Sequence, residues 1–225
     1  MIFNRWVVAL VPMKEHSERV PGKNTRPFCG RPLFEHILAT LEETYAVDAV
    51  VVNTDSERIG ADAVGSFPKV TVLERPEELC GDFVSMNKII AHDIGEVPSD
   101  IYLQTHSTNP LLRPKTIGEA LKAFVQAEKN DSLFSVNRMQ SRFYDAEGRP
   151  INHDPEELLR TQDLRPVYEE NSVLYAFTSE SFLAMGRRIG RRPLLFETDR
   201  IESIDIDDEF TFRLAEMLAS YARGA

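Results

Sequence analysis

Short apolar segments alternate with longer segments of helical periodicity along most of this chain. The apolar segments are rich in Val, Ile and Leu, as buried strands are, and they cover residues 6–10, 49–52, 70–73, 101–103 and 133–136. The helical period recurs in residues 32–45, 85–95 and 113–128. Because repeated strand–helix–strand order favours parallel units with right-handed crossovers, the alternation predicts an α/β fold. We expect a mostly parallel sheet with helices on both of its faces.

The alternation is interrupted once, by the polar and turn-rich residues 137–170. It resumes with a strand over 171–177, a helix over 179–190, short strands over 194–197 and 202–206, and a helix over 208–222. We therefore predict one domain over residues 1–225 with an insertion at 137–170. Ligands of such sheets bind beyond the carboxyl ends of the strands, so the loops after the strands are the candidate sites.

Charge and cysteine content limit the function. The chain has 36 acidic and 26 basic residues and a net charge of -10, whereas general nucleic-acid binding needs a basic excess. Cys29 and Cys80 lie far apart and outside any CxxC pair, so neither a disulfide framework nor a zinc cluster is predicted. No apolar stretch is long enough to cross a bilayer, and no signal peptide is recognisable. We expect a cytoplasmic protein that has no membrane partner.

The loop after the first strand, "VPMKEHSERVPGKNTRPFCGRPL", carries five basic and two acidic side chains in an acidic protein. It contains neither GxGxxG nor GxxxxGK[ST], so a phosphate cradle made of backbone alone is not indicated. Anion binding would depend on Lys14 and Lys23 as point charges, helped by Ser17 and Asn24. The alternative is a solvated surface loop. The position, length and opposite charge of the loop favour a functional role.

The segment "ESIDIDDEF" near the end of the chain carries a possible metal site. If Ile204 and Ile206 point into the core from a strand, Asp205 and Asp207 share its opposite face. Two carboxylates together with substrate phosphates are a common ligand set for Mg²⁺. The alternative is that Asp207 or Asp208 caps the last helix, which explains Asp205 poorly.

Polar side chains follow the strand "IYLQ" and are suited to reading a polar ligand; they are Gln104, Thr105, His106, Ser107, Thr108 and Asn109. The alternative is an ordinary turn, which uses the same residue types. The histidines have no metal-binding spacing such as HExxH, and no GxSxG elbow is present.

Two further candidates follow other strands. In "ERPEELCGDFVSMNKII", Arg75 could reach a phosphate or base together with Asp82 and Ser85. Equally, Asp82 or Ser85 could cap a helix and Arg75 could form a surface ion pair. Asn171 could contact a sugar or serve as a turn residue.

Five segments, in order along nearly the whole chain, together resemble the acylneuraminate cytidylyltransferases. They are "VPMKEHSERVPGKN", "NTDSERIGADA", "ERPEELCGD", "RTQDLRPVYEENSVLY" and "SIDIDDEFTF". The resemblance implies a divergent member with a Rossmann-like fold and an inserted dimerisation element, active as a homodimer. It also implies transfer of CMP from CTP to the anomeric hydroxyl of a 2-keto sugar acid, with Mg²⁺ as cofactor and pyrophosphate as the second product.

The same resemblance assigns roles to individual residues. The catalytic residues it implies are Lys23, Asp205 and Asp207, and the two aspartates are also the Mg²⁺ ligands. The nucleotide-binding residues it implies are Leu10, Pro12, Lys14, Ser17, Lys23, Asn24, Arg75, Asp82 and Ser85. The acceptor-binding residues it implies are Gln104, His106, Asn109, Gln162 and Asn171.

Departures from the family pattern bear on the substrate. Glu18 stands where the family has Lys, Arg19 where it has Gly, and Thr161 where it has Arg. Thr cannot pair with a carboxylate as Arg does, so we expect an acceptor other than N-acetylneuraminate. The CMP-Kdo synthetases have an acidic residue after the fourth strand. The segment "QTHSTN" at this position has none, which disfavours a CMP-Kdo synthetase. Three alternatives to CMP transfer onto a sugar acid remain. The enzyme could use another nucleotide or acceptor, it could carry out a sugar-phosphate type of transfer, or the protein could bind a nucleotide without turnover.

Overall fold

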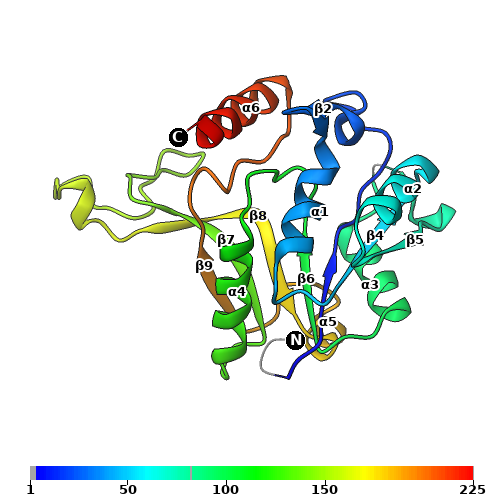
Figure 1. Ribbon diagram of the computed structural model, residues 1–225. Helices are drawn as coiled ribbons and strands as arrows, with labels where there is room; N and C mark the ends of the chain where they lie inside the picture. Colours follow the sequence, from blue (N-terminus) through cyan, green and yellow to red (C-terminus); the bar gives the residue numbers. More distant parts are fainter. Residues whose placement is uncertain (1–3, 82, 225) are drawn as a thin grey trace.

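A computed structural model describes residues 4–81 and 83–224, with side chains through residue 221. A seven-stranded sheet in the order β5-β4-β1-β6-β8-β7-β9 crosses the molecule (Figure 1). Its strands are β1 (Val7–Leu10), β4 (Ala49–Thr54), β5 (Val70–Glu74), β6 (Ile101–Thr105), β7 (Ser132–Met139), β8 (Val167–Phe177) and β9 (Pro193–Glu197). Strands β5, β4, β1 and β6 are parallel, and β9 is parallel to β7. Only β8 runs antiparallel to both of its neighbours, so the predicted mostly parallel sheet is confirmed.

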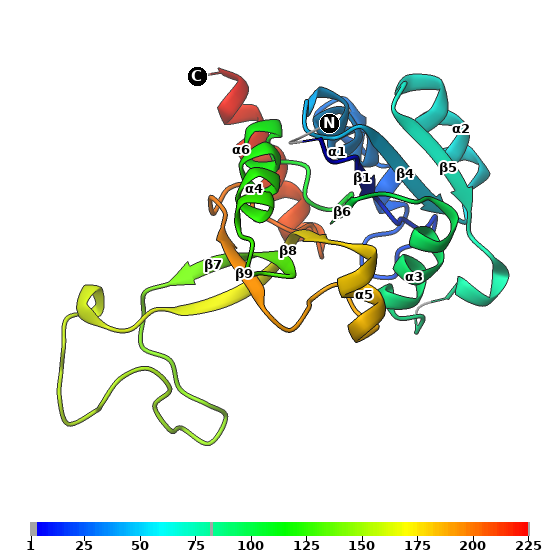
Figure 2. The same cartoon turned by 90° about the horizontal axis from the view of Figure 1, so that it is seen from below.

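Helices cover both faces of the sheet, as the alternation predicted (Figures 1 and 2). One face packs against α1 (Leu33–Glu43), α2 (Glu57–Ser66) and α4 (Pro114–Gln126) in the largest hydrophobic cluster. The other face packs against α3 (Met86–Glu96) and α5 (Ser179–Met185). The last helix, α6 (Glu209–Gly224), instead packs on the hairpin of β2 (Pro27–Phe28) and β3 (Arg31–Pro32). Within the described residues, no helix has the length and apolar character needed to cross a membrane.

The predicted helix over 179–190 is shorter than its periodicity suggested. Thr178 begins α5 with a capping box that it shares with Ser181. Gly186 ends the helix because it adopts φ 63°, a left-handed conformation that glycine tolerates and that stops the helix at Met185. The chain then turns through residues 187–190 toward β9.

The predicted strand over 202–206 is wrong. This segment lies beside the loop after β6, where Ile206 N donates to Thr108 O at 2.9 Å and Asn109 Nδ2 donates to Ile204 O at 3.3 Å. A strand needs a strand partner with a matching row of backbone groups, and a loop does not provide one. The buried side chain of Ile206 still anchors the segment, in the cluster under α6.

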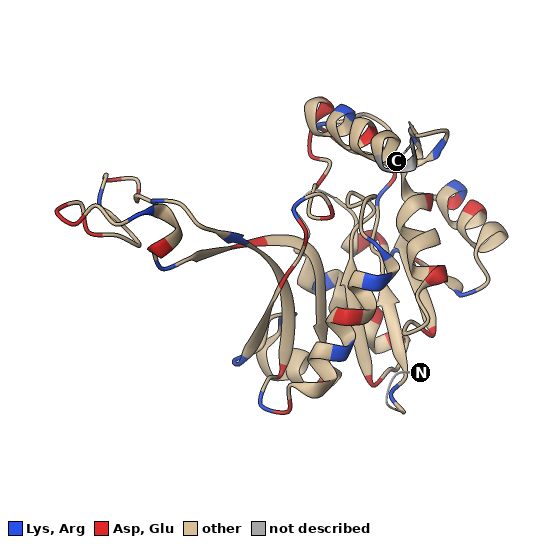
Figure 3. Ribbon diagram, turned by 60° about the vertical axis from the view of Figure 1, so that its left-hand side comes forward, with Lys and Arg blue, Asp and Glu red and all other residues tan. Residues whose placement is uncertain are grey.

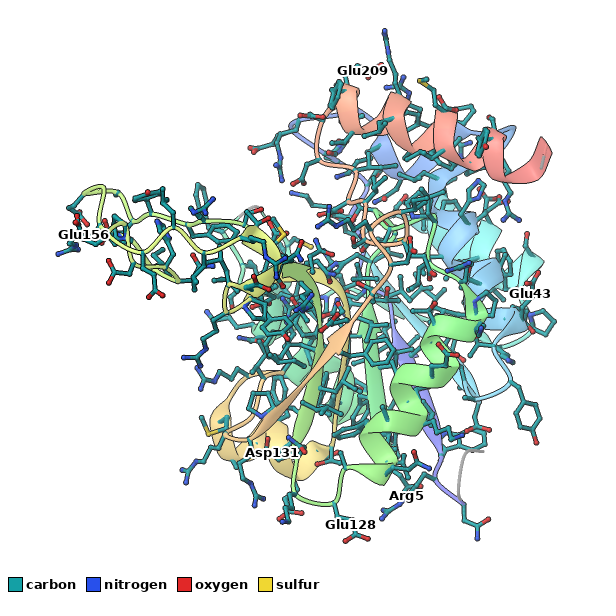
Figure 4. All side chains as sticks on the ribbon, turned by 90° about the vertical axis from the view of Figure 1, so that its left-hand side faces the viewer. Arg5, Glu43, Glu128, Asp131, Glu156 and Glu209 are labelled. Atoms are coloured by element: carbon teal, nitrogen blue, oxygen red, sulfur yellow. The ribbon has the colours of Figure 1, made fainter. Side chains whose placement is uncertain are left out.

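The region between β7 and β8 forms an arm that projects from the body of the molecule (Figures 2 and 3). Glu156, labelled in Figure 4, lies near its outer end. The arm contains an isolated bridge between Tyr144 and Pro150 and the short helix η3 (Thr161–Asp163). Strand β7 extends to Met139 and β8 begins at Val167, so the projecting part is shorter than the predicted insertion at 137–170.

Candidate active site

The loop after β1 and the loop after β6 enclose a cavity of about 330 Å³. Both loops leave the carboxyl ends of adjacent parallel strands, where ligands of such sheets bind. The cavity is lined by Pro12, Met13, Lys14, His16, Ser17, Glu18, Arg19, Lys23, Asn24, His106, Ser107 and Thr108. Five of the nucleotide-binding predictions, Pro12, Lys14, Ser17, Lys23 and Asn24, therefore lie together with His106.

Asn24 joins the two loops that form the cavity. Its Nδ2 donates to Lys14 O at 2.7 Å, and its Oδ1 accepts from Ser107 Oγ at 2.7 Å. Asn24 lies in η1 (Lys23–Thr25), which begins after Gly22 in a left-handed conformation with φ 62°. That φ needs glycine and turns the chain so that Lys23 and Asn24 face inward. Because both ends of the Asn24 amide are used by protein groups, its side chain shapes the loop.

Lys23 connects the opening loop to the end of the chain. Its Nζ donates to Ile206 O at 2.7 Å, which leaves further N–H donors on the ammonium at the cavity wall. Partial burial lowers the pKa of Lys23, whereas the nearby Asp205 and Asp207 carboxylates raise it. The two carboxylates therefore act electrostatically on the Lys23 ammonium.

Asp205 and Asp207 fit a hard cation such as Mg²⁺. Oδ1 of Asp205 is buried and has no hydrogen-bond partner. Burial raises the pKa of Asp205, a hydrogen bond from Thr108 opposes the shift, and the charge of Asp207 adds to it. No group of three His, Cys, Asp or Glu side chains suited to a metal occurs within the described residues, so protein alone would leave a cation short of ligands. Phosphate oxygens and water would have to complete the coordination.

The capping alternative for this segment applies to Asp208. Its Oδ1 accepts from Thr211 N at 2.7 Å, which caps the first turn of α6. Asp207 instead forms an ion pair with Arg19 at 2.8 Å. Capping and the candidate metal site therefore use different aspartates.

His106 and Gln104 form a second polar group beside the cavity. Burial lowers the pKa of His106 to about 3, and the positive charges of Arg188 and Lys23 contribute. His106 is therefore neutral near pH 7. Gln104 is fully buried, with its Nε2 2.9 Å from Nε2 of His106 and its Oε1 2.5 Å from Nη1 of Arg188.

Arg75 lies inside the protein, so the surface ion-pair alternative is wrong for it. Only 8% of the residue is exposed, and its Nη2 donates to Met13 O at 3.2 Å and to Asn53 O at 2.9 Å. Its Nε donates to Asn53 Oδ1, and Asn53 Nδ2 in turn donates to the buried Asp93. Arg75 thus holds Met13, a residue of the opening loop that lines the cavity, against Asn53 of β4.

Several predicted residues lie outside the cavity lining. Leu10 is fully buried in the core of the α3 and α5 face, and Asn109 hydrogen-bonds the 202–206 segment. Ser85 occupies the N-cap position of α3 but makes no capping hydrogen bond with its side chain. Gln162 is exposed in η3 and is not part of the cavity lining. Asp82 lies outside the described residues.

Asn171 is engaged within the sheet. Its Oδ1 accepts from Ser135 Oγ at 2.6 Å, and its Nδ2 donates to Asn137 Oδ1 at 3.0 Å and Thr198 Oγ1 at 2.7 Å. It lies opposite the register shift between Phe134 and Val136, where β7 and β8 leave regular pairing. The sugar contact predicted for Asn171 would have to replace hydrogen bonds that join β8 to β7 and to the residue after β9.

The sequence analysis missed Arg188 and Asn53. Arg188 lies in an arginine-rich turn that resembles any solvated surface segment, so nothing local distinguishes it. Asn53 had a detectable signal, because it is a polar residue inside the apolar strand "AVVVNT" and such residues need a partner when buried.

Solved structures with the same fold are nucleotidyltransferases. A CMP:2-keto-3-deoxy-manno-octonic acid synthetase in complex with CTP matches with a TM-score of 0.65, 16% identity, and coverage of 96% of this chain and 99% of that one. A 4-diphosphocytidyl-2C-methyl-D-erythritol synthase from Anaerococcus prevotii matches with a TM-score of 0.69, 13% identity and 96% coverage of both chains. The shared fold, with a polar cavity at the strand ends, defines the class as a Rossmann-like α/β protein.

Sequence comparison gives the family within that class. The cytidylyltransferase family model matches residues 8–217, and the chain belongs to this family. It is 27% identical to the CMP-N,N'-diacetyllegionaminic acid synthase of Legionella pneumophila, over 94% of this chain and 95% of the relative. It is 25% identical to the N-acylneuraminate cytidylyltransferase of Escherichia coli over 93% of this chain, which spans only 51% of that relative. The resemblance to the acylneuraminate cytidylyltransferases is thus confirmed. The chain has diverged in sequence from these relatives but belongs to the same family of cytidylyltransferases.

Proposed function

We propose that this protein transfers CMP from CTP to the anomeric hydroxyl of a 2-keto sugar acid and releases pyrophosphate. The observation that carries the proposal is the contact of Lys23, which lines the cavity from the opening loop, with Ile206, the residue between Asp205 and Asp207 near the end of the chain. The similar proteins are named for transfer to legionaminic, N-acylneuraminic, pseudaminic and 3-deoxy-manno-octulosonic acids, which all belong to this acceptor class.

The chemistry follows from the charges at the cavity. The anomeric oxygen forms a bond to the α-phosphorus of CTP, the bond from that phosphorus to the β-phosphate oxygen breaks, and the hydroxyl proton is lost to solvent. Negative charge increases on the phosphate oxygens, and the Lys23 ammonium lies where it can stabilise that charge. Asp205 and Asp207 would hold Mg²⁺, whose chemistry here is charge neutralisation and a lower pKa for the attacking hydroxyl.

Pyrophosphate release tests the proposal directly. CTP, UTP, GTP and ATP are each combined with N-acetylneuraminate, legionaminic, pseudaminic and 3-deoxy-manno-octulosonic acids, with and without Mg²⁺. We expect release with CTP and at least one sugar acid other than N-acetylneuraminate, only when Mg²⁺ is present. Binding of CTP without product across the whole set would contradict the proposal and favour a nucleotide-binding protein.

The aspartates provide a matched set of variants. Asp205→Ala and Asp207→Ala are expected to lower kcat by about 100-fold or more, because each removes a ligand of the cation that would neutralise phosphate charge. Asp208→Asn is the control, since it removes a neighbouring charge and keeps a side chain that caps α6. Full activity in both alanine variants would contradict the metal assignment.

We also propose that the arm joins two copies of the chain in the cytoplasm, where CTP is available. Exposed apolar side chains on the arm support this: Tyr144, Ile151, Leu158 and Leu159 are 54%, 58%, 81% and 43% exposed. Because Gln162 lies apart from the cavity of its own chain, any contact between Gln162 and an acceptor needs a second copy. Sedimentation equilibrium of the wild type and of Leu158→Glu tests this: a dimer that the variant dissociates supports it, and a wild-type monomer contradicts it.

A further inference from the structure

Arg188 is a partly buried cation whose described partners are all uncharged. It follows α5, and its guanidinium lies over the ring of Tyr175, 3.6 Å from the centroid. Its Nη1 donates to Oε1 of the buried Gln104 at 2.5 Å. None of the ion pairs among the described residues includes Arg188. A guanidinium has five N–H donors, so most of them remain for another group.

The acid nearest to this cluster is already engaged. Glu170 accepts a hydrogen bond of 2.5 Å from the hydroxyl of Tyr175, whose ring Arg188 covers. Burial lowers the pKa of Arg188, and the nearby Glu170 carboxylate opposes that shift only in part. Holding a cation out of water without a direct counter-charge is unfavourable for the folded protein. Such an arrangement is stabilised when an anion binds.

A cavity of about 300 Å³ opens at Arg188. It is lined by Met86, Asn87, Glu170, Arg187, Arg188 and Ile189, two basic side chains against one acidic. Its volume is at the lower end of the range for small-molecule sites. The excess of positive charge is notable because the whole chain has a net charge of -10.

Two hydrogen-bonded side chains connect this second cavity to the candidate active site. Arg188 contacts Gln104, Gln104 contacts His106, and His106 lines the first cavity with Lys23. All of these groups lie near the carboxyl end of β6, between the opening loop and the start of α3. The carboxylate of a 2-keto sugar acid is bonded to the anomeric carbon, so an acceptor whose carboxylate reaches Arg188 would place its anomeric hydroxyl beside Gln104 and His106, next to the first cavity.

We propose that Arg188 determines specificity by binding the carboxylate of the acceptor with its planar guanidinium. This inference rests on the proposed function, which supplies an acceptor that carries a carboxylate. Thr161, which stands where the family pattern has Arg, is exposed on the arm and cannot pair with a carboxylate. Arg188 supplies a guanidinium at the cavity itself, stacked on Tyr175 and held by Gln104, so that little rotamer freedom is lost on binding.

A paired change in ligand and protein tests the assignment. The probes are the sugar acid that the wild type turns over fastest with CTP and the carboxamide of the same sugar. For the wild type we expect kcat/KM to be about 10- to 100-fold higher for the acid, as for a hydrogen bond to a charged group. For Arg188→Gln we expect the kcat/KM values for the acid and the carboxamide to agree within about threefold. Only the value for the acid should fall, mainly because its KM rises. Arg188→Lys should keep part of the preference, because it keeps the charge without the fork.

Arg187→Gln is the matched control, since Arg187 is the exposed neighbour that lines the same cavity. It should keep the preference for the acid. A structural brace would instead lower the thermal stability of Arg188→Gln and leave the ratio of acid to carboxamide unchanged, and that result would overturn the assignment. Equal losses in Arg187→Gln and Arg188→Gln would overturn it as well.

The outcomes separate this inference from the proposed function. Turnover with the preference intact in Arg188→Gln contradicts the role of Arg188 alone. Absence of turnover with every nucleotide and sugar acid contradicts the proposed function and the role of Arg188 together. If Arg188→Gln does not fold, Arg188→Lys tests the role of Arg188. An unchanged preference for the acid over the carboxamide in Arg188→Lys would contradict recognition by the guanidinium fork.

Discussion

Nη2 of Arg19 lies 2.8 Å from Oδ1 of Asp207, so a cation of the opening loop is paired with a candidate Mg²⁺ ligand. The side chains of Arg19 and Asp207 are 67% and 47% exposed, and ion pairs in such positions contribute only about 0–1 kcal/mol. The pair is therefore weak enough to open when a divalent cation and a triphosphate arrive. Arg19 is also one of the residues that depart from the family pattern.

Arg19→Ala should lower the Mg²⁺ concentration needed for half-maximal activity, by about two- to fivefold, because Asp207 loses a competing cation. The thermal unfolding midpoint should change little. The difference should shrink at high ionic strength, since salt screens an exposed pair. A Mg²⁺ titration of pyrophosphate release checks this, with Arg58→Ala, from the exposed pair with Asp62, as control. An unchanged or higher Mg²⁺ requirement in Arg19→Ala would contradict the competition.

Lys23→Ala should weaken CTP binding by about 10- to 100-fold, because a charge-assisted hydrogen bond to phosphate is lost. Lys23→Arg should recover part of the binding. Isothermal titration calorimetry with CTP measures both, and Lys115→Ala, from an exposed helical pair on α4, is the control. If Lys23→Ala binds and turns over CTP like the wild type, the role of the opening loop as a triphosphate site is wrong.

Asn24 and Ser107 should be energetically coupled, because their 2.7 Å hydrogen bond joins the two loops of the cavity. Asn24→Ala is expected to lower the free energy of unfolding by about 1–3 kcal/mol, since it also leaves Lys14 O without this donor. A double-mutant cycle with Ser107→Ala, measured by urea unfolding, should give a coupling of about 1 kcal/mol. Strictly additive losses would show that the two side chains act independently.

His106 should make the stability of the protein depend on pH in acid. Its pKa is lowered to about 3 in the folded state, against an ordinary histidine pKa of 6.5, so between these values the unfolded chain binds more protons. Stability should therefore be full above pH 6.5 and fall as the pH decreases toward 3, with a slope from this residue of at most about 1.4 kcal/mol per pH unit. Urea unfolding of the wild type and His106→Gln between pH 4 and 7 checks this. Identical slopes would contradict the pKa of His106.

The candidate site could be predicted in part because several of its residues are close in sequence. Lys14, Ser17, Lys23 and Asn24 belong to one loop after one strand, and the position of that loop follows from the strand–helix alternation. The prediction of a metal site at Asp205 and Asp207 rested on a strand that the structure does not contain. Asp205 and Asp207 lie near Lys23, yet no strand places them there, because a period of two in the sequence does not show whether a strand partner exists.

Local sequence determined most of the strands and helices. Apolar runs became β1, β4 and β6 because burial is decided by side-chain type, and α5 ended at Gly186 because of the φ that glycine allows. Only the tertiary structure decided which distant groups meet: Lys23 with Ile206, 183 residues apart, and Gln104 with Arg188, 84 residues apart. Charge, desolvation and hydrogen bonding depend on distances in space, and those distances exist only once the sheet has assembled.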